Sequence, residues 1–272
     1  MGRFWGKEDP PPARVKPAPI TLVLYLINFA HSRIVVDGRS PPANAERAWA
    51  DMICIAFYFL LRPSEYAGVD GEHASFTLDD VHLYVGSRKL CIATALERDI
   101  CNATTMRLHF TTQKNQRRGD LIAHTRSRHP YCCPVLATIR MILTHRQWFA
   151  QAGEPFDGTV RLASFYHRNQ RVNIRSSDLT AQLRFAAREC FHATGISPKD
   201  ITARSLRAGG AMALLCGEVD KNTIQLLGRW YSDSMLRYLH QEAKPITDNL
   251  AVKMFNGGSY EFLPTAIIPS LA

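Results

Sequence analysis

The run of residues 45–61 constrains the fold of this chain more than any other segment. We expect one long helix here, and its second half, residues 52–61, is apolar on nearly every face. A helix that is apolar all round is buried, so other elements must surround this one. The apolar run has only ten residues, which suits a buried helix and is too short to span a bilayer. The sequence therefore predicts a globular domain built around a central helix.

The end of this helix is also predictable. Pro63 disfavours helical geometry at the residue before it, so the helix should end close to Arg62. Arg62 is followed by Pro63-Ser64-Glu65, which places a carboxylate next to the arginine at the helix end.

The rest of the chain predicts a mixed α/β fold that is predominantly helical, with a small antiparallel β-sheet. Alternating residues predict strands that are joined by turns, and the last two strands form a hairpin with a basic tip. Strands are expected over residues 81–85, 90–95, 106–112 and 120–125; helices over 20–32, 134–152, from Ser177 or Asp178 to 190, and near 204–217, 220–228 and 232–243. Residues 153–175 are expected to be irregular. We expect a disordered tail over 1–18, one domain over 19–245, and a C-terminal tail over 246–272 that docks on a neighbouring protomer.

Charge and cysteine content bear on partners and location. The net charge is +9 and the pI is near 9.4, which favours a polyanionic partner such as nucleic acid. The seven cysteines are odd in number and lack the Cys-x-x-Cys spacing of zinc sites, so we interpret them as reduced thiols. We expect a soluble intracellular protein without a metal.

Residues 204–238 carry the strongest chemical signal. Arg204 and Arg207 stand three residues apart on an expected helix, Trp230 follows a short helix later, and Tyr238 comes eight residues after it. Arginine binds phosphate oxygens through a two-pronged guanidinium. A tyrosine hydroxyl can attack a phosphodiester and hold one DNA end covalently. Surface arginines and a core tryptophan are the ordinary alternatives.

The small residues after Arg207 need a reason of their own. Gly209 and Gly210 are consecutive, and each costs a helix about 1 kcal/mol relative to alanine. Close approach to a neighbouring element, or to DNA, would explain them.

In their order along the chain, these motifs resemble those of the tyrosine recombinases, and they look closest to the eukaryotic Crypton-like mobile-element recombinases. The resemblance runs from about residue 45 to 243 and implies the catalytic-domain fold of that family. It implies that arginines hold the scissile phosphate, Lys114 protonates the leaving oxygen, Trp230 positions the phosphate and Tyr238 is the nucleophile. The arginines are Arg62, Arg204 and Arg207; Glu65 supports Arg62, and Arg117, Arg118 and Arg229 are expected to contact DNA.

The chain departs from the family pattern at two places. Arg204 stands where the family usually has histidine, and arginine cannot shuttle a proton at neutral pH. Only about 45 residues precede the helix that leads to Arg62, whereas family members usually carry a DNA-clamping domain there.

The resemblance implies site-specific recombination of double-stranded DNA through a 3′-phosphotyrosyl intermediate, by a homo-oligomer and without cofactor or metal. Two alternatives stay open: a relic that binds DNA without cutting it, and a type IB topoisomerase. A basic RNA-binding protein is a third, generic reading, although the sequence lacks an aromatic recognition motif. The expected location is the nucleus in a eukaryotic host and otherwise the cytoplasm.

Overall fold

The structure is a computed structural model, and it describes residues 15–32, 43–67, 75–111, 119–230 and 249–260. Within these ranges the fold is mixed α/β, predominantly helical, with a small antiparallel sheet, as predicted. No helix in the described ranges is both long and apolar enough to cross a membrane.

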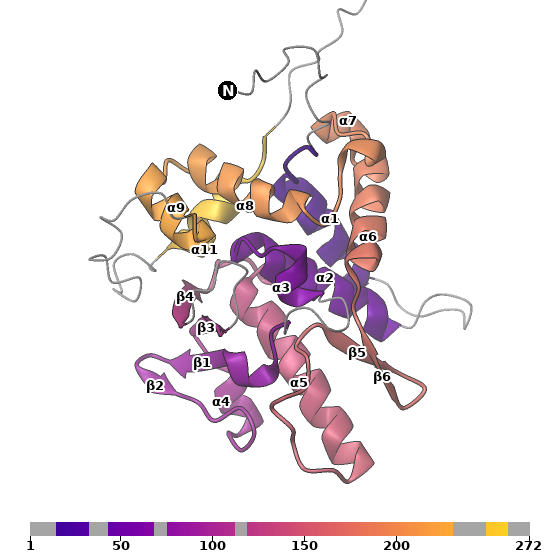
Figure 1. Cartoon of the computed structure of the whole chain (residues 1–272), viewed down its shortest axis with the longest axis vertical. Coiled ribbons are helices and arrows are strands. Elements are labelled where there is room, and N and C mark those ends of the chain that lie inside the picture. The colour runs from indigo at the N-terminus through magenta and orange to yellow at the C-terminus, as the bar shows by residue number, and fades with distance from the viewer. Residues whose placement is uncertain (1–14, 33–42, 68–74, 112–118, 231–248, 261–272) are drawn as a thin grey trace, which may run out of the picture.

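The central helix is α2 (Ala43–Tyr58), and its second half is fully buried, as its apolar sequence predicts. It lies in the middle of Figure 1 and packs against elements from both halves of the chain. These neighbours are α1 (Ile20–Ser32), α5 (Pro134–Ala152), α6 (Ser176–Glu189), α8 (Ser205–Cys216) and β5 (Ser164–His167). One continuous apolar core results, and the helix holds the two halves together.

The main sheet has four antiparallel strands in the order β2-β1-β3-β4. Their bounds are β1 (Val81–Val85), β2 (Arg88–Lys89), β3 (Thr105–Phe110) and β4 (Asp120–Thr125). Buried and partly exposed residues alternate along β3, because one sheet face packs on the core and the other does not. The hydroxyl of Thr138 on α5 donates to the sulfur of Met106 at 2.9 Å, which places α5 on the core face. The predicted pairing of β3 with β4 is confirmed.

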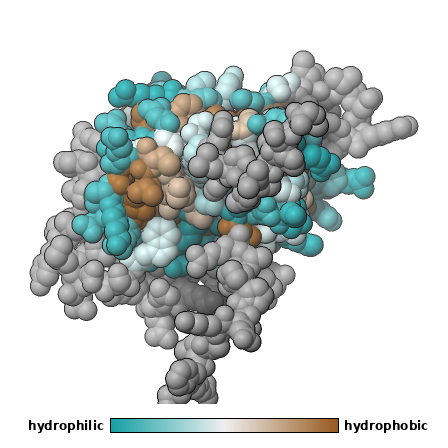
Figure 2. Space-filling view, turned by 90° about the horizontal axis from the view of Figure 1, so that it is seen from above, coloured by the Kyte–Doolittle hydropathy of each residue, from teal (hydrophilic) through white to brown (hydrophobic). Residues whose placement is uncertain are grey.

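Short elements connect these layers. They are α3 (Pro63–Tyr66), η1 (Leu78–Asp80), α4 (Glu97–Cys101), α7 (Phe191–Thr194), η2 (Pro198–Asp200), α9 (Lys221–Gly228) and α11 (Leu250–Gly257). In Figure 1, α8, α9 and α11 lie together above the sheet and beside α2. The face seen in Figure 2 is mostly hydrophilic, and its hydrophobic residues are gathered in separate patches.

Several predicted boundaries were wrong. Residues 15–18 are not part of a loose tail, because the amides of Lys16 and Ala18 donate to the carbonyls of Asp200 and Ser205. Residues 91–95 are not a strand: the chain turns here and enters α4. The domain also extends beyond residue 245, because Leu250, Ala251 and Met254 of α11 belong to the core.

The segment 153–175 is not irregular throughout. It contains a hairpin of β5 and β6 (Gln170–Asn173). Arg168 and Asn169 form its two-residue loop, and both have positive φ, as the commonest tight hairpin turn requires. The predicted helix over 232–243 lies outside the described residues.

Candidate functional site

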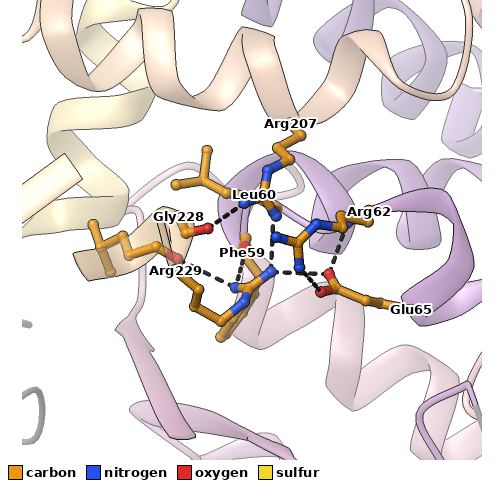
Figure 3. Close-up of polar contacts among 8 residues, drawn as sticks. Phe59, Leu60, Arg62, Glu65, Arg207, Gly228 and Arg229 are labelled. Atoms are coloured by element: carbon orange, nitrogen blue, oxygen red, sulfur yellow. Dashed lines mark hydrogen bonds and ion pairs between the residues drawn. The ribbon is translucent and has the colours of Figure 1, made fainter. Parts of the chain in front are cut away.

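The candidate site is built around the end of α2, where the chain leaves the core. Leu60 has φ of +52°, a left-handed conformation that costs a non-glycine residue about 1–2 kcal/mol. This turn presents the carbonyl oxygens of Phe59 and Leu60 to side chains from elsewhere in the chain (Figure 3). Arg62 is extended, with φ of −78° and ψ of 147°, as its position before Pro63 predicts.

Arg62 and Glu65 form one local unit at this corner. The backbone N–H of Arg62 donates to Glu65 Oε2 at 2.7 Å, and its Nη1 donates to Oε1 at 3.0 Å. The carboxylate thus caps the first turn of α3 and fixes the arginine beside it. Glu65 thus lies beside Arg62, and its supporting role in a recombinase site stays a prediction.

Arg207 comes from the first turn of α8 and reaches the same corner. Its Nη1 donates to the carbonyl of Leu60 at 2.9 Å, and its Nη2 donates to the carbonyl of Gly228 at the end of α9. Arg207 and Arg62, 145 positions apart in the sequence, are therefore brought to one place, as the family pattern implies. Two of the five N–H donors of Arg207 have these backbone partners, and its side chain is only partly buried.

Trp230 packs on Arg207. The Arg207 Cζ lies 4.5 Å from the centroid of the indole ring, which is a cation–π contact. The ring also lies against Gly228, where a Cβ atom would collide with it. Trp230 is 37% exposed, so it covers the arginine without belonging to the core.

Arg229 differs from the expectation that it contacts DNA. Its side chain is completely buried, and its Nη2 donates to Glu65 Oε2 at 2.9 Å. The guanidinium also donates to the carbonyls of Phe59, Leu60 and Leu227. Its Cζ lies 3.9 Å from the ring centroid of Phe110, at the end of β3. The prediction that Arg229 contacts DNA was wrong. The sequence shows a basic residue near the expected site, but it does not show that the partner of this residue, Glu65, lies inside the protein.

The electrostatics of the cluster leave positive charge in excess. Three arginines (Arg62, Arg207 and Arg229) share the carboxylate of Glu65, and Asp120 adds a second negative charge near Arg229, so the formal sum is +3 − 2 = +1. Burial, with the positive charges of Arg229 and Arg62, lowers the pKa of Arg207 to about 9, and Glu65 opposes this shift. The guanidinium therefore stays protonated at neutral pH, but nearby carboxylates balance its positive charge only in part. A bound anion would relieve this repulsion.

Arg204 lies at the start of α8, and its side chain is exposed. It makes no side-chain hydrogen bond or ion pair with any residue in the described ranges. It lies one helical turn before Arg207, at the helix end where the macrodipole favours an anion.

Gly209 and Gly210 are explained by packing. A Cβ on Gly209 would collide with the carbonyl oxygen of Ala18, and one on Gly210 would collide with the carbonyl oxygen of Phe57. Of the two reasons that the sequence left open, close approach to a neighbouring element therefore holds. The Gly210 contact seats α8 on α2, and the Gly209 contact seats it on the segment before α1; together they place Arg207.

The remaining predicted site residues are not placed. Lys114, Arg117, Arg118 and Tyr238 lie outside the described residues. The strands that flank the predicted lysine hairpin are described, and the end of β3 reaches the cluster through the contact of Phe110 with Arg229. Sequence reasoning missed Leu60 and Phe110, because a backbone carbonyl and a core phenylalanine carry no motif.

Comparisons with known proteins return no match: no protein-family model fits the sequence, and no curated protein or solved structure is significantly similar. The resemblance to tyrosine recombinases therefore rests on the motifs and remains a prediction.

Proposed function

We propose that the chain is a tyrosine recombinase that breaks and rejoins double-stranded DNA. The observation that carries this proposal is the convergence of Arg62 and Arg207, from distant parts of the sequence, in one cluster with surplus positive charge. A phosphodiester is the anion that suits it, because guanidinium groups match the geometry of phosphate oxygens. The net charge of +9 agrees with a polyanionic partner.

In the proposed reaction, Tyr238 attacks the scissile phosphorus. A bond forms between the phenol oxygen and phosphorus, the bond to the 5′-oxygen breaks, and the phenol proton is lost to solvent. Lys114 gives a proton to the leaving 5′-oxygen, which departs as a hydroxyl. The 5′-hydroxyl of a partner strand then reverses the step and releases the tyrosine. The phosphodiester energy is kept in the phosphotyrosyl link.

Arg62, Arg204 and Arg207 would bind the non-bridging oxygens during this step. Arg204 lacks a partner in the described part of the chain, so its donors are available to an incoming phosphate. Trp230 holds the guanidinium of Arg207 from one side, which limits its motion. Such preorganised donors act strongly because they need not reorganise when charge develops on the phosphate.

Covalent trapping tests this proposal. The protein and its Tyr238→Phe variant are incubated with suicide DNA substrates, and SDS-resistant protein–DNA adducts are measured. We expect an adduct with the wild type and none with the variant. An adduct of equal yield with Tyr238→Phe would contradict the assignment of the nucleophile.

A DNA-binding relic is the second candidate, and one observation favours it. Two donors of Arg207 are already bound to backbone carbonyls, and no histidine stands at the Arg204 position. A relic would bind DNA in a salt-sensitive manner and form no adduct on any substrate.

A further inference from the structure

The hairpin of β5 and β6 has a free end that the cluster around Arg207 does not use. Residues 167–173 are all exposed, and the loop of the hairpin lies at the outer edge of the molecule in Figure 1. In the described part of the chain, no side chain of residues 167–170 has a hydrogen-bond or ion-pair partner. These side chains are therefore available to a ligand from outside the chain.

The base of the hairpin is held from both sides. The ring of Phe165 packs against that of Trp49 on α2, with the ring centroids 6.0 Å apart. The next residue points to the opposite face of the strand. There the ring of Tyr166 stacks on Trp148 of α5 at 4.6 Å, and its hydroxyl forms a hydrogen bond of 2.6 Å with His145 Nδ1. Because the base lies between two helices, the tip is presented in a fixed direction.

The tip holds an arginine in a conformation that favours glycine. Arg168 has φ of +48° and Asn169 has φ of +60°, both in the left-handed region. Glycine adopts this region freely, whereas an arginine there costs about 1–2 kcal/mol. Residues in such strained conformations cluster at binding sites. Since Arg168 has no side-chain partner in the described ranges, the fold gives no reason for an arginine here.

The dimensions of the hairpin suit the major groove of duplex DNA. Paired strands lie about 5 Å apart, and the groove, about 12 Å wide and 8.5 Å deep, admits a two-stranded ribbon. The free end, from the pair of His167 and Gln170 to the loop, is about 7 Å long at roughly 3.3 Å per residue. Side chains at the tip extend this reach to the base edges. Arg171 is not counted, because its charge interacts with Asp157 and Tyr166.

The residue types at the tip are those that recognise bases. Arginine donates two hydrogen bonds to O6 and N7 of guanine, and asparagine or glutamine pairs in a similar way with N6 and N7 of adenine. Arg168, Asn169 and Gln170 follow one another at the free end. Val172 is the one apolar residue among 167–173, and it is 37% exposed, so the apolar centre typical of protein interfaces is missing from these seven positions. Base edges therefore suit the tip better than a protein surface does.

Backbone hydrogen bonds connect the hairpin with the cluster. The amide of Phe76 donates to the carbonyl of Glu65 at 3.0 Å, and the amide of Leu162 donates to the carbonyl of Phe76 at 2.9 Å. Two strand spacings of about 5 Å, and the six residue steps of about 3.3 Å from Leu162 to Arg168, place the tip within roughly 30 Å of Glu65. That span corresponds to about nine base pairs at roughly 3.4 Å per pair.

We propose that the tip of the β5–β6 hairpin recognises bases in the major groove of the DNA that flanks the cleavage site, and that Arg168 binds a guanine. The proposal rests on the proposed function and adds sequence specificity to it. The arginines of the cluster cannot supply this specificity, because phosphate groups are the same at every base pair.

Two exposed arginines with positive φ provide a matched test. Arg168 has φ of +48° and Arg128 has φ of +67°, so Arg168→Gly and Arg128→Gly each remove one charge and relax the same backbone conformation. Only Arg168 lies on the hairpin. The full chain and each variant are incubated with a DNA duplex library that contains about 20 randomised base pairs, roughly twice the span to the tip, and the bound sequences are determined.

We expect the wild type and Arg128→Gly to select the same motif, which contains a guanine. Arg168→Gly should lose the preference for guanine at that one position, by about 5- to 150-fold in relative affinity, and keep the other preferences. An unchanged motif in Arg168→Gly, the same loss in both variants, or the absence of a motif with the wild type would overturn the proposal. A uniform loss of affinity across all sequences would also overturn it, because a phosphate contact behaves in that way.

The outcome separates this proposal from the proposed function. If the wild type forms a Tyr238-dependent adduct while Arg168→Gly selects the wild-type motif, base recognition by the hairpin is refuted and cleavage stands. If no adduct forms while Arg168→Gly alone alters the motif, cleavage is refuted and the hairpin stands as the element that recognises bases.

Discussion

Arg229 and Glu65 form a buried ion pair across 164 residues of sequence, with Nη2 of the arginine 2.9 Å from Oε2 of the carboxylate. The same carboxylate also accepts two hydrogen bonds from Arg62. One glutamate therefore ties the exit of α2 to the end of α9 and fixes two arginines at once. Removal of the carboxylate would leave the Arg229 charge buried without a counter-charge.

We therefore expect Glu65→Ala to lower the free energy of unfolding by about 3–5 kcal/mol, the usual cost of breaking a buried pair. Urea unfolding followed by circular dichroism measures it. Glu154→Ala, at an exposed glutamate, is the control and should change stability by less than about 0.5 kcal/mol. A similar small change in Glu65→Ala would show that the pair is not formed.

The second prediction concerns Arg207 and the proposed reaction. Arg207→Lys keeps the charge but loses the planar fork whose Nη1 and Nη2 donate to the Leu60 and Gly228 carbonyls, because all donors of an ammonium sit on one nitrogen. We expect the rate of adduct formation to fall by about 10²–10³. Arg188→Lys, at an exposed arginine of α6, should leave the rate unchanged. A wild-type rate in a folded Arg207→Lys variant would remove this residue from the site.

The third prediction uses the sign of a stability change at Gly209 and Gly210. In an exposed helix, Gly→Ala stabilises by about 1 kcal/mol. Here the new Cβ atoms would collide with the carbonyls of Ala18 and Phe57, so both substitutions should destabilise, by about 1–3 kcal/mol. The midpoint of urea unfolding measures the effect, and Ala181→Gly, at an exposed alanine inside α6, gives the intrinsic cost of glycine in a helix. A gain in stability at either glycine would contradict the close packing of α8.

The fourth prediction is a pH dependence of stability. Burial lowers the pKa of His124 and of His145 to about 4, below the usual 6.5. Between pH 6.5 and 4 the unfolded chain then binds more protons than the folded one, so the free energy of unfolding falls as the pH falls. The loss reaches up to about 3 kcal/mol per histidine and is absent above pH 7.

Urea unfolding at a series of pH values checks this dependence. His124→Phe should flatten the curve between pH 6.5 and 4, whereas His192→Phe, at an exposed histidine, should leave its slope unchanged. A slope in His124→Phe equal to that of the wild type would show that His124 titrates normally.

The sequence predicted the features that depend on local rules. The apolar run before Arg62 required a buried helix, Pro63 required an extended Arg62, and alternation marked β3 and β4. The approach of Arg62 to Arg207 also followed, but only through the resemblance, since no local rule joins residues so far apart.

The remaining features depend on tertiary contacts that leave no local signal. Arg229 has the sequence context of a surface cation, and only the fold shows Glu65 beneath it. The β5–β6 hairpin was missed because its loop, Arg168-Asn169, adopts positive φ without the glycine that usually marks such a turn.

The left-handed turn at Leu60 has an evolutionary consequence. Its carbonyl oxygen, which is shared by Arg207 and Arg229, belongs to the backbone, so substitution at position 60 leaves the acceptor in place provided that the turn keeps its shape. The Leu60 side chain itself is completely buried in the core, so replacements at this position must be apolar residues that fit the core and tolerate positive φ. Such replacements would keep the acceptor that anchors both arginines.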